Sequence, residues 1–415
     1  MILKKNPRLQ KVIKRTESFC DNAAEIESDS ILYGIQETRN SKSIPVIALE
    51  KELDLKLDGG SYLTRFTADG RFLLIAGSKG HVSGLNWQTK NLRFEQNFNE
   101  MIYDATWLQN ETMFAVAQKK YTFIYDHHGA ELHRLKKHTD VRHLEYLRHH
   151  YLLATSSLGN ILRYHDISTG ILTTEMNTKN GAAVCMKQNS QNGVINLGHA
   201  SGTVTFWSPA TQIPLAKMYC HKGPVSAMAV DFEGMLMATA GSDGQIKLWD
   251  LRNFSKSHVF NLSMPASSLD FSQKGYLVAG YSNRLSIWRS DDFETKRPST
   301  GFKLGNCTVK ETRFCPFEDY LGIGHSSGAK IIMAANSCIE AFDSSEINLY
   351  ATKKQRQELE VRSLLDKLAP ETIQLDTSTI LEINKKEAEI QEQEPIKRKR
   401  PRAGISALDR FIRNE

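Results

Sequence analysis

The sequence predicts an all-β protein whose strands form the blades of a seven-bladed β-propeller. Gly or Asn recurs just before a strand-like run, and the steps from residue 159 onward are 43, 42, 39 and 45 residues. The gap of 79 residues before residue 159 leaves room for one more unit, with its turn near Lys119–Lys120. Gly and Asn suit the positive φ of a tight turn, and a period of about 40–45 residues is typical of propeller blades. The six turn residues are Gly80, Gly159, Gly202, Gly244, Asn283 and Gly328.

Aromatic residues near the end of the strand after each turn follow the same period. In the third unit a histidine takes this place. A single unit cannot bury both of its faces, so we expect neighbouring units to pack side by side and close a ring. These residues are Trp87, Tyr125, His165, Trp207, Trp249 and Trp288.

The stretch His221–Asp250 is the most regular unit. Its apolar runs AMAV, MLMATA and QIKLWD, with the turn-rich GSDG before the last, predict an antiparallel meander rather than a helix. The unit resembles one WD repeat, in which His221, Thr239, Asp243 and Trp249 would form a hydrogen-bonded tetrad with a structural role. Asp is missing from the matching positions of other units, so we expect a degenerate tetrad there and ring closure by apolar packing. Those positions hold Lys79, Leu158, Ser201, Ser282 and Ser327.

Composition divides the chain into four parts. We expect a basic N-terminal arm over 1–43, the propeller over 44–341, a helical extension over 342–383 and a charged tail over 384–415. Acidic and Ser residues at 343–346 are suited to cap a helix that ends near Pro370. Apolar side chains at i, i+3, i+4 and i+7 form a stripe that either packs on the propeller or docks on a partner. The stripe consists of Val361, Leu364, Leu365 and Leu368.

The positive charge lies at the ends of the chain. The net charge is +6, but residues 1–20 and 395–402 each carry +5, which leaves about −4 for the remainder. The run KRKRPR at 397–402 is typical of a nuclear localisation signal or a nucleic-acid patch. We therefore expect RNA or assembly contacts from the ends and from the extension. The candidates are Lys4, Lys5, Arg8, Lys11, Lys14, Arg15, Lys353, Lys354, Arg356, Lys397, Arg398, Lys399, Arg400 and Arg402.

Bulk features indicate a soluble intracellular protein. No apolar run reaches the 18 residues of a membrane span, and the N-terminus lacks the apolar core of a signal peptide. The six cysteines show no CxxC pairing, which favours reduced thiols over a disulfide framework.

The sequence offers one motif for catalysis and two histidine pairs for metal binding. Gly324–Gly328 fits the G-x-S-x-G elbow of a hydrolase around Ser326, but the following AKIIM reads as a strand where an elbow needs a helix. The same turn recurs at Gly198–Gly202 with Ala200 in the nucleophile's place, as expected for a repeat. The pairs are His127–His128 and His149–His150, and adjacent histidines in a strand point to opposite faces. We expect no enzyme activity, no metal and no cofactor.

Several stretches resemble one eukaryotic family. LDLKLDGGSYLTRFTADGRFLLIAGSKGHVSGLNWQT, LGHASGTVTFWSP, RFCPFEDYLGIGHSSG and FDSSEINLYATKKQRQELEVRSLLDKL are similar to the WD-repeat protein of the small-subunit processome, of the BING-four C-terminal type. The resemblance runs from about residue 54 to 368. The chain departs from the family in its short N-terminal arm and in Ala351, where an acidic residue is more usual.

The resemblance implies a non-catalytic scaffold of the U3 small nucleolar ribonucleoprotein that supports pre-rRNA processing to 18S rRNA. The implied partners are pre-rRNA and processome proteins, with neither a membrane nor a small-molecule substrate, and the implied location is the nucleolus of the nucleus. The alternative is a general WD-repeat adaptor, such as a ubiquitin-ligase receptor or a chromatin scaffold.

Overall fold

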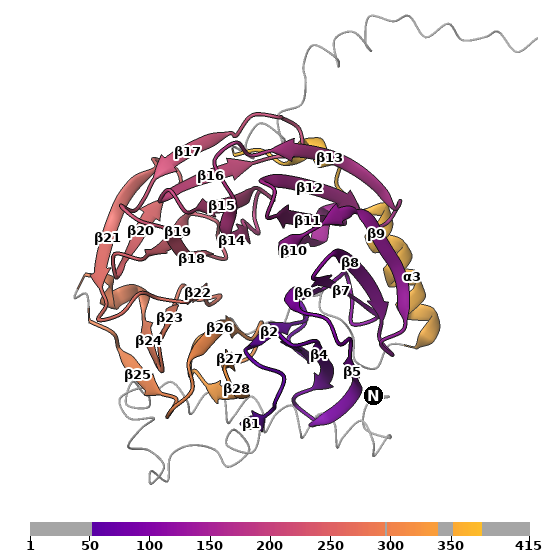
Figure 1. Ribbon diagram of the computed structural model, residues 1–415, viewed down its shortest axis with the longest axis horizontal. Coiled ribbons are helices and arrows are strands. Elements are labelled where there is room, and N and C mark those ends of the chain that lie inside the picture. Colours follow the sequence, from indigo (N-terminus) through magenta and orange to yellow (C-terminus); the bar gives the residue numbers. More distant parts are fainter. Residues whose placement is uncertain (1–51, 295–296, 339–351, 376–415) are drawn as a thin grey trace, which may run out of the picture. The chain divides into compact units, whose positions relative to one another are not determined.

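The computed structural model describes residues 52–294, 297–338 and 352–375. These residues form seven four-stranded antiparallel sheets, which are arranged around a central axis as the blades of a propeller (Figure 1). The predicted fold class is confirmed.

Each blade runs from an innermost to an outermost strand. The first blade contains β2 (Tyr62–Phe66), β3 (Phe72–Gly77), β4 (His81–Asn86) and β5 (Asn91–Asn97), and the second contains β6 (Ile102–Trp107), β7 (Met113–Gln118), β8 (Tyr121–Asp126) and β9 (Glu131–Thr139). The third contains β10 (Val141–Leu147), β11 (Leu152–Ser157), β12 (Ile161–Asp166) and β13 (Ile171–Asn177), and the fourth contains β14 (Ala183–Gln188), β15 (Ile195–His199), β16 (Thr203–Trp207) and β17 (Ala216–Tyr219). The fifth contains β18 (Val225–Val230), β19 (Leu236–Gly241), β20 (Gln245–Asp250) and β21 (Ser255–Asn261), and the sixth contains β22 (Ser268–Phe271), β23 (Leu277–Tyr281), β24 (Arg284–Trp288) and β25 (Thr300–Lys303). The seventh contains β26 (Val309–Phe314), β27 (Tyr320–His325), β28 (Gly328–Met333) and β1 (Leu53–Lys56). Short 3₁₀ helices are η5 (Arg148–His150), η6 (Ser290–Phe293) and η7 (Pro370–Thr372).

The ring is closed by the strand at the start of the described chain. β1 pairs antiparallel with β28, from Leu53 opposite Ile331 to Lys56 opposite Gly328. The strand therefore completes the seventh blade rather than the first. This pairing joins the two ends of the ring by backbone hydrogen bonds, in addition to the apolar packing expected from the sequence.

In most blades, the turn before the third strand has its residue of positive φ where the sequence predicts it. Two assignments are wrong by one residue: Asn160 has φ 63° where Gly159 was expected, and Ser282 has φ 50° where Asn283 was expected. The residue that matches Asp243 in the third blade is consequently Gly159 and not Leu158. Asp is absent from this turn in every blade except the fifth, so the expected degeneracy of the tetrad stands.

The middle strands are apolar because each blade is covered on both faces by its neighbours. All six residues of β3, FLLIAG, are buried. Between the first and second blades, the rings of Phe94 and Phe114 stack with their centroids 4.7 Å apart. Full burial of a large apolar side chain stabilises a fold by roughly 1.5–3 kcal/mol. Among the aromatic residues that follow the repeat, Trp87, Trp207 and Trp288 are almost completely buried and so contribute to this packing.

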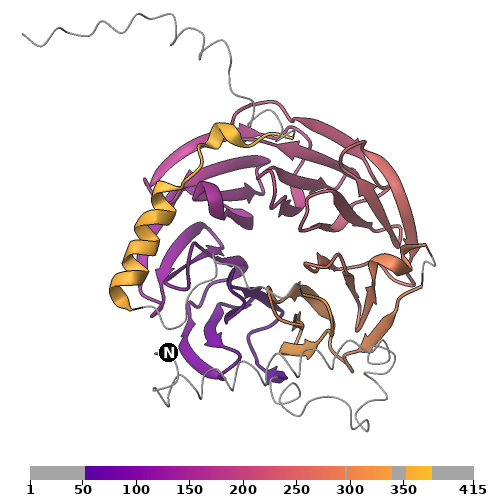
Figure 2. The ribbon, with the colours of Figure 1, turned by 180° about the vertical axis from the view of Figure 1, so that it is seen from behind.

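Within residues 52–294, 297–338 and 352–375 the one α-helix is α3 (Lys353–Leu365), which lies beside the second and third blades (Figure 2). Thr352 caps it: its hydroxyl accepts from the backbone N–H of Gln355, and the Gln355 side chain accepts from the backbone N–H of Thr352. This capping box sets the described start of the helix, whereas the caps expected at 343–346 lie outside the described residues. The helix ends five residues before Pro370 because the chain turns to bond with the third blade, where the N–H of Leu368 donates to the carbonyl of His149.

Candidate nucleic-acid and assembly interface

Only one group of the predicted cations lies within the described residues. Lys353, Lys354 and Arg356 occupy the first turns of α3. The Lys354 side chain is 85% exposed, and its Nζ lies 4.0 Å from a carboxylate oxygen of Glu358. The arm residues Lys4, Lys5, Arg8, Lys11, Lys14 and Arg15 and the tail residues Lys397, Arg398, Lys399, Arg400 and Arg402 lie outside the described residues.

Polar contacts attach α3 to the propeller. Asn110, in the loop between β6 and β7, donates to the Glu360 carboxylate over 3.2 Å. The hydroxyls of Tyr151 and Ser363 are 2.7 Å apart. The helix is thus held to loops of the second and third blades by hydrogen-bonding side chains and not by its apolar stripe.

The apolar stripe of α3 remains largely exposed. Val361 is 58% exposed, Leu364 47% and Leu365 80%, while Leu368, the fourth predicted member, is 46% exposed and lies after the end of the helix at Leu365. Of the two alternatives for this stripe, the structure contradicts burial against the propeller. The alternative that it docks on a partner stays open.

The segment after α3 packs tightly on the third and fourth blades. Ile373 is fully buried in the core cluster that contains Trp207, and its carbonyl accepts from the Ser208 hydroxyl over 2.6 Å. Thr372 is hydrogen-bonded to His150 over 3.0 Å. This attachment was not predicted from the sequence, where its only signal is the pair of apolar residues Ile373 and Leu375 shortly after Pro370.

A buried ion pair reinforces the attachment. The Lys367 ammonium contacts a carboxylate oxygen of Asp166 and donates to Ser168 over 2.8 Å. Burial alone would raise the pKa of Asp166, but the bonds from Lys367 and Ser168 outweigh it and hold that pKa below its ordinary value. The extension is therefore fixed to the third blade by charge as well as by apolar packing.

The fifth blade contains a continuous hydrogen-bonded chain. Trp249 Nε1 donates to the Thr239 hydroxyl over 2.9 Å, and the same hydroxyl is 2.9 Å from His221 Nε2. His221 Nδ1 lies 3.1 Å from both carboxylate oxygens of Asp243. Burial lowers the pKa of His221 despite Asp243, so the ring is neutral near pH 7. When the proton of the His221 ring is on Nδ1, each donor in this hydrogen-bonded chain has an acceptor. The turn that contains Asp243 is thereby linked to β19 and β20.

Two other blades keep fragments of this chain. In the fourth, the Thr205 hydroxyl is 2.7 Å from His199 Nε2 and accepts from Trp207 Nε1 over 2.8 Å. In the third, His138 Nδ1 is 2.8 Å from the Thr155 hydroxyl. Burial lowers the pKa of His138 to about 3, so this histidine is neutral at physiological pH. The first contact lies within the fourth blade, and the second joins β9 of the second blade to β11 of the third.

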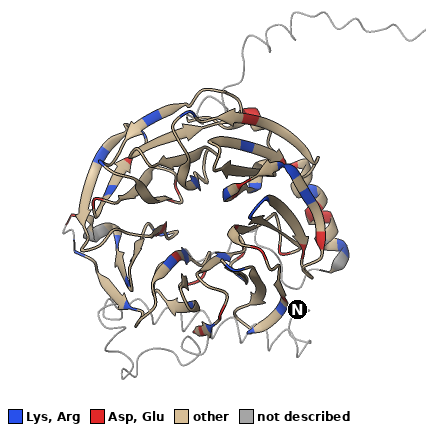
Figure 3. Cartoon of the chain, viewed as in Figure 1, with Lys and Arg blue, Asp and Glu red and all other residues tan. Residues whose placement is uncertain are grey.

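Charged side chains meet near the axis of the ring. The Arg65 guanidinium lies 3.2 Å from Asp104, 3.5 Å from Glu145 and 3.3 Å from Glu311. Figure 3 shows charges of both signs on the inner strands. We call this group the axial ion network. Its members come from six of the seven innermost strands: Arg65 (β2), Asp104 (β6), Glu145 (β10), Lys187 (β14), Asp270 (β22), Glu311 and Arg313 (both β26).

The axial ion network joins blades that are not neighbours. Arg313 of the seventh blade lies 3.3 Å from Glu145 of the third and 3.3 Å from Asp270 of the sixth. Burial raises the pKa of Glu145, and it raises that of Asp270 to about 6. A cavity of about 190 Å³ lies beside these residues and is lined by Lys187 and Phe232 among others. The network was not predicted from the sequence, although the sequence contains a signal of it: an isolated charged residue within most of the innermost strands.

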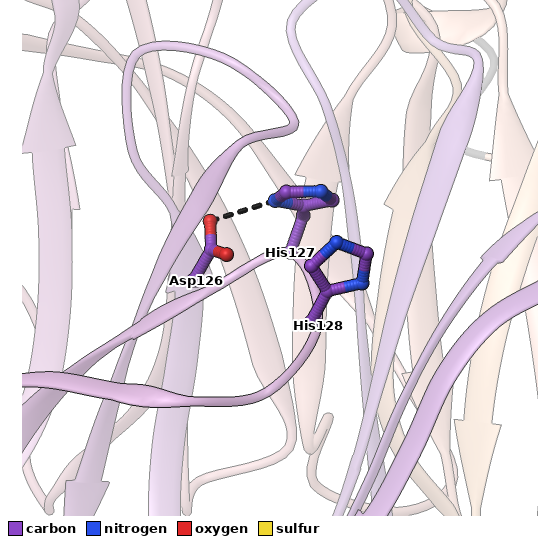
Figure 4. A group of neighbouring side chains, drawn as sticks. All are labelled: Asp126, His127 and His128. Carbon is purple, nitrogen blue, oxygen red and sulfur yellow. Dashed lines mark hydrogen bonds and ion pairs between the residues drawn. The ribbon is translucent and has the colours of Figure 1, made fainter.

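Asp126, His127 and His128 form the one described group of three side chains that offers metal-ligand atoms close together (Figure 4). The premise that adjacent histidines point apart is wrong here, because both lie in the turn after β8 and their ring centroids are 3.7 Å apart. His127 Nδ1 is hydrogen-bonded to Asp126 over 2.7 Å, and this bond lowers the pKa of Asp126. His150 of the second pair is instead bonded to the extension, as described above.

Ser326 lies in the turn between β27 and β28, and its hydroxyl accepts from the backbone N–H of Thr308 over 3.2 Å. The strand expected directly after this turn is confirmed as β28, so the geometry of a nucleophile elbow is absent at this serine.

Among the described residues, no helix is long and apolar enough to cross a membrane.

The fold and the repeated turns define a WD-repeat β-propeller with a C-terminal extension docked on its third and fourth blades. Residues 212–250 match the WD domain, G-beta repeat, and residues 299–376 match the BING4CT (NUC141) domain. The second match spans the last blade, α3 and the docked segment.

Relatives extend the match along most of the chain. The chain is 41% identical over 379 residues to U3 small nucleolar RNA-associated protein 7 of Saccharomyces cerevisiae, a match that covers 86% of this chain and 68% of the yeast protein. It is 38% identical to WD repeat-containing protein 46 of Caenorhabditis elegans, over 93% of this chain and 68% of that protein. It is 39% identical to the human protein of the same name, over 86% of this chain and 59% of that protein. The chain therefore belongs to the family of U3 small nucleolar RNA-associated protein 7 and WD repeat-containing protein 46.

Proposed function

We propose that this protein is a non-catalytic scaffold subunit of the small-subunit processome, the particle that contains the U3 small nucleolar RNA. In this role it supports the folding and processing of pre-rRNA toward 18S rRNA in the nucleolus. The observation that carries the proposal is the 41% identity, over 86% of the chain, to a protein named for its association with the U3 small nucleolar RNA.

The site geometry supports a scaffold rather than an enzyme. The polar side chains of the fifth blade are bonded to one another, and those of the axial ion network are paired across the ring. Ser326 lacks the helix that a hydrolase nucleophile requires. We therefore expect a Ser326→Ala variant to support ribosome assembly as well as the wild-type protein.

The proposed contact surfaces are the two basic ends and α3. Residues 1–20 and 397–402 supply Lys and Arg for phosphate contacts, which give affinity without sequence choice. The stripe containing Leu365 supplies an apolar surface for a protein neighbour, because exposed apolar patches typically mark protein interaction sites.

Purification of the tagged full-length protein from nuclear extract tests the proposal. U3 RNA and pre-rRNA are expected to be enriched over a spliceosomal RNA of similar abundance, and the fluorescently tagged protein is expected in the nucleolus. Recovery of ubiquitin-ligase or chromatin subunits without U3 RNA would instead support a general WD-repeat adaptor.

A further inference from the structure

The propeller carries a basic surface of its own on the second blade. Between residues 118 and 142 the chain has six Lys or Arg and three Asp or Glu, a local net charge of +3. The part of the chain between the two basic ends is net negative, so this concentration is not a general property of the propeller. We define the blade-two basic surface as Lys119, Lys120, Arg134, Lys136 and Lys137, all of which are exposed.

Two separate elements bring these cations together around Tyr121. Lys119 and Lys120 form the turn between β7 and β8, and Arg134 lies on the outermost strand β9. The Lys120 ammonium and the Arg134 guanidinium each lie 5.3 Å from the centre of the Tyr121 ring. Because a cation is attracted to the face of an aromatic ring, Tyr121 holds both charges near one another.

A bulge in β9 presents the remaining two lysines. Leu135 and Thr139 pair with the adjacent residues Thr122 and Tyr121 of β8, so the three residues between Leu135 and Thr139 have no partners on β8. His138 turns inward and is hydrogen-bonded to Thr155 of the next blade, while Lys136 and Lys137 are exposed. Bulges commonly redirect side chains in this way. Figure 3 shows the Lys and Arg bands on β9.

These charges are not required to protect a sheet edge. Lysine on an edge strand discourages aggregation, but β9 has three Lys or Arg whereas every other outermost strand has one or none. The other six turns at the position of Lys119 and Lys120 contain a single lysine between them. None of these five side chains forms an ion pair with a described residue, so the charges are unpaired within that part of the chain.

We propose that the blade-two basic surface binds the phosphate backbone of an RNA strand. Unpaired and exposed cations on a rigid strand and turn release counterions when they meet phosphates, and they do so without ordering a flexible tail. An RNA fits better than an acidic protein segment because the proposed function, on which this inference rests, places the protein in an RNA particle. Its residues belong to β9 and to the turn between β7 and β8, and none of them is part of the basic ends or of α3.

Binding of a labelled 20-nucleotide single-stranded RNA to the full-length protein tests the inference. The test variant replaces Lys119, Lys120, Lys136 and Lys137 with Gln and keeps Arg134 on the Tyr121 ring. The matched control replaces four exposed lysines of other blades, Lys56, Lys222, Lys256 and Lys303, with Gln and removes the same net charge.

We expect the test variant to lose at least roughly tenfold in affinity at 100 mM salt, and its log–log salt slope to fall by about 2–3, since each phosphate contact on a single strand contributes about 0.7. The control is expected to stay within about threefold of the wild type, because its lysines are scattered. Equal losses in both variants would overturn the inference. A loss of binding to polyglutamate without a loss of RNA binding would also overturn it.

Two further measurements distinguish a failure of this inference from misfolding of a variant and from a failure of the proposed function. Ultraviolet crosslinking of RNA to the wild-type protein is expected to mark peptides from 119–137, and crosslinks confined to the ends would contradict the inference without any variant. If U3 RNA still co-purifies with the wild type while both variants bind RNA equally, this inference fails and the proposed function stands. If U3 RNA does not co-purify, the proposed function fails whatever the binding assay shows.

Discussion

Replacement of Arg65 with Met is expected to destabilise the propeller more than any surface charge change. Arg65 is 14% exposed and contacts three carboxylates, those of Asp104, Glu145 and Glu311. These carboxylates outweigh the effect of burial and raise the pKa of Arg65, so the side chain is charged in the folded state. Removing one partner of a buried ion pair costs roughly 3–5 kcal/mol, because the other partner stays buried and unpaired.

Such a loss is measurable, since a folded domain is typically stable by only about 5–15 kcal/mol. Urea unfolding followed by tryptophan fluorescence gives the free energy of unfolding of each variant. The matched control is Arg252→Met: Arg252 is 67% exposed and pairs with Asp250 at 2.9 Å, and an exposed pair contributes at most about 1 kcal/mol. Equal losses in the two variants would refute the view that the axial ion network holds the ring together.

The pH dependence provides a second check on the same variant. Burial already raises the pKa of Glu145 and Glu311 in the presence of Arg65, and the loss of its charge raises both further. A carboxyl whose pKa is higher in the folded than in the unfolded state favours folding below its unfolded pKa, and this contribution is lost as the pH rises through the folded pKa. The deficit of Arg65→Met relative to wild type should therefore be smaller at pH 5 than at pH 8. A deficit that grows on acidification would contradict this reasoning.

Three other changes test the fifth blade, the docked extension and the tail. Thr239→Val leaves Trp249 Nε1 buried without its acceptor and should lower the free energy of unfolding by about 1–3 kcal/mol. The matched control is Thr122→Val: the Thr122 hydroxyl is buried and has no partner among the described residues, so its loss should be nearly neutral. Ile373→Ala should weaken the attachment of the extension by about 2–5 kcal/mol, seen as faster proteolysis near residue 373 with the propeller intact. Replacement of Lys397–Arg400 with Ala should lower the log–log salt slope of RNA binding by at most roughly 2.8–3.6, and an unchanged slope would exclude the tail from RNA contact.

The blades were predictable from the sequence because their signals are local. Turn residues and strand-end aromatics recur with the period of one blade, and each reflects a requirement that every blade meets separately. The errors at Gly159 and Asn283 arose where two neighbouring residues both suit a turn, so that composition could not decide between them. The pairing of β1 with the seventh blade was not predicted for a different reason: Leu53 pairs with Ile331, and such a distant pairing leaves no trace in a local pattern.

The surfaces were harder to predict than the blades because charge was summed over the chain and not over its surface. The sum that assigns the excess charge to the ends is correct, yet it hides a local net charge of +3 over residues 118–142. The apolar stripe of α3 suggested burial or docking equally well, and only the contacts of Glu360 and Ser363 show which side of the helix meets the propeller.

The axial ion network does what packing between neighbours cannot do. Inter-strand hydrogen bonds act within each blade and apolar contacts link each blade to the next, so a local opening between two blades need not affect the others. Glu145 of the third blade binds Arg65 of the first and Arg313 of the seventh, and these bonds cross the axis. Opening any gap that separates these blades exposes or unpairs buried charge elsewhere in the ring. The network therefore makes unfolding of distant blades cooperative, and this property suits a rigid subunit that must present its extension and its basic surface in a fixed arrangement.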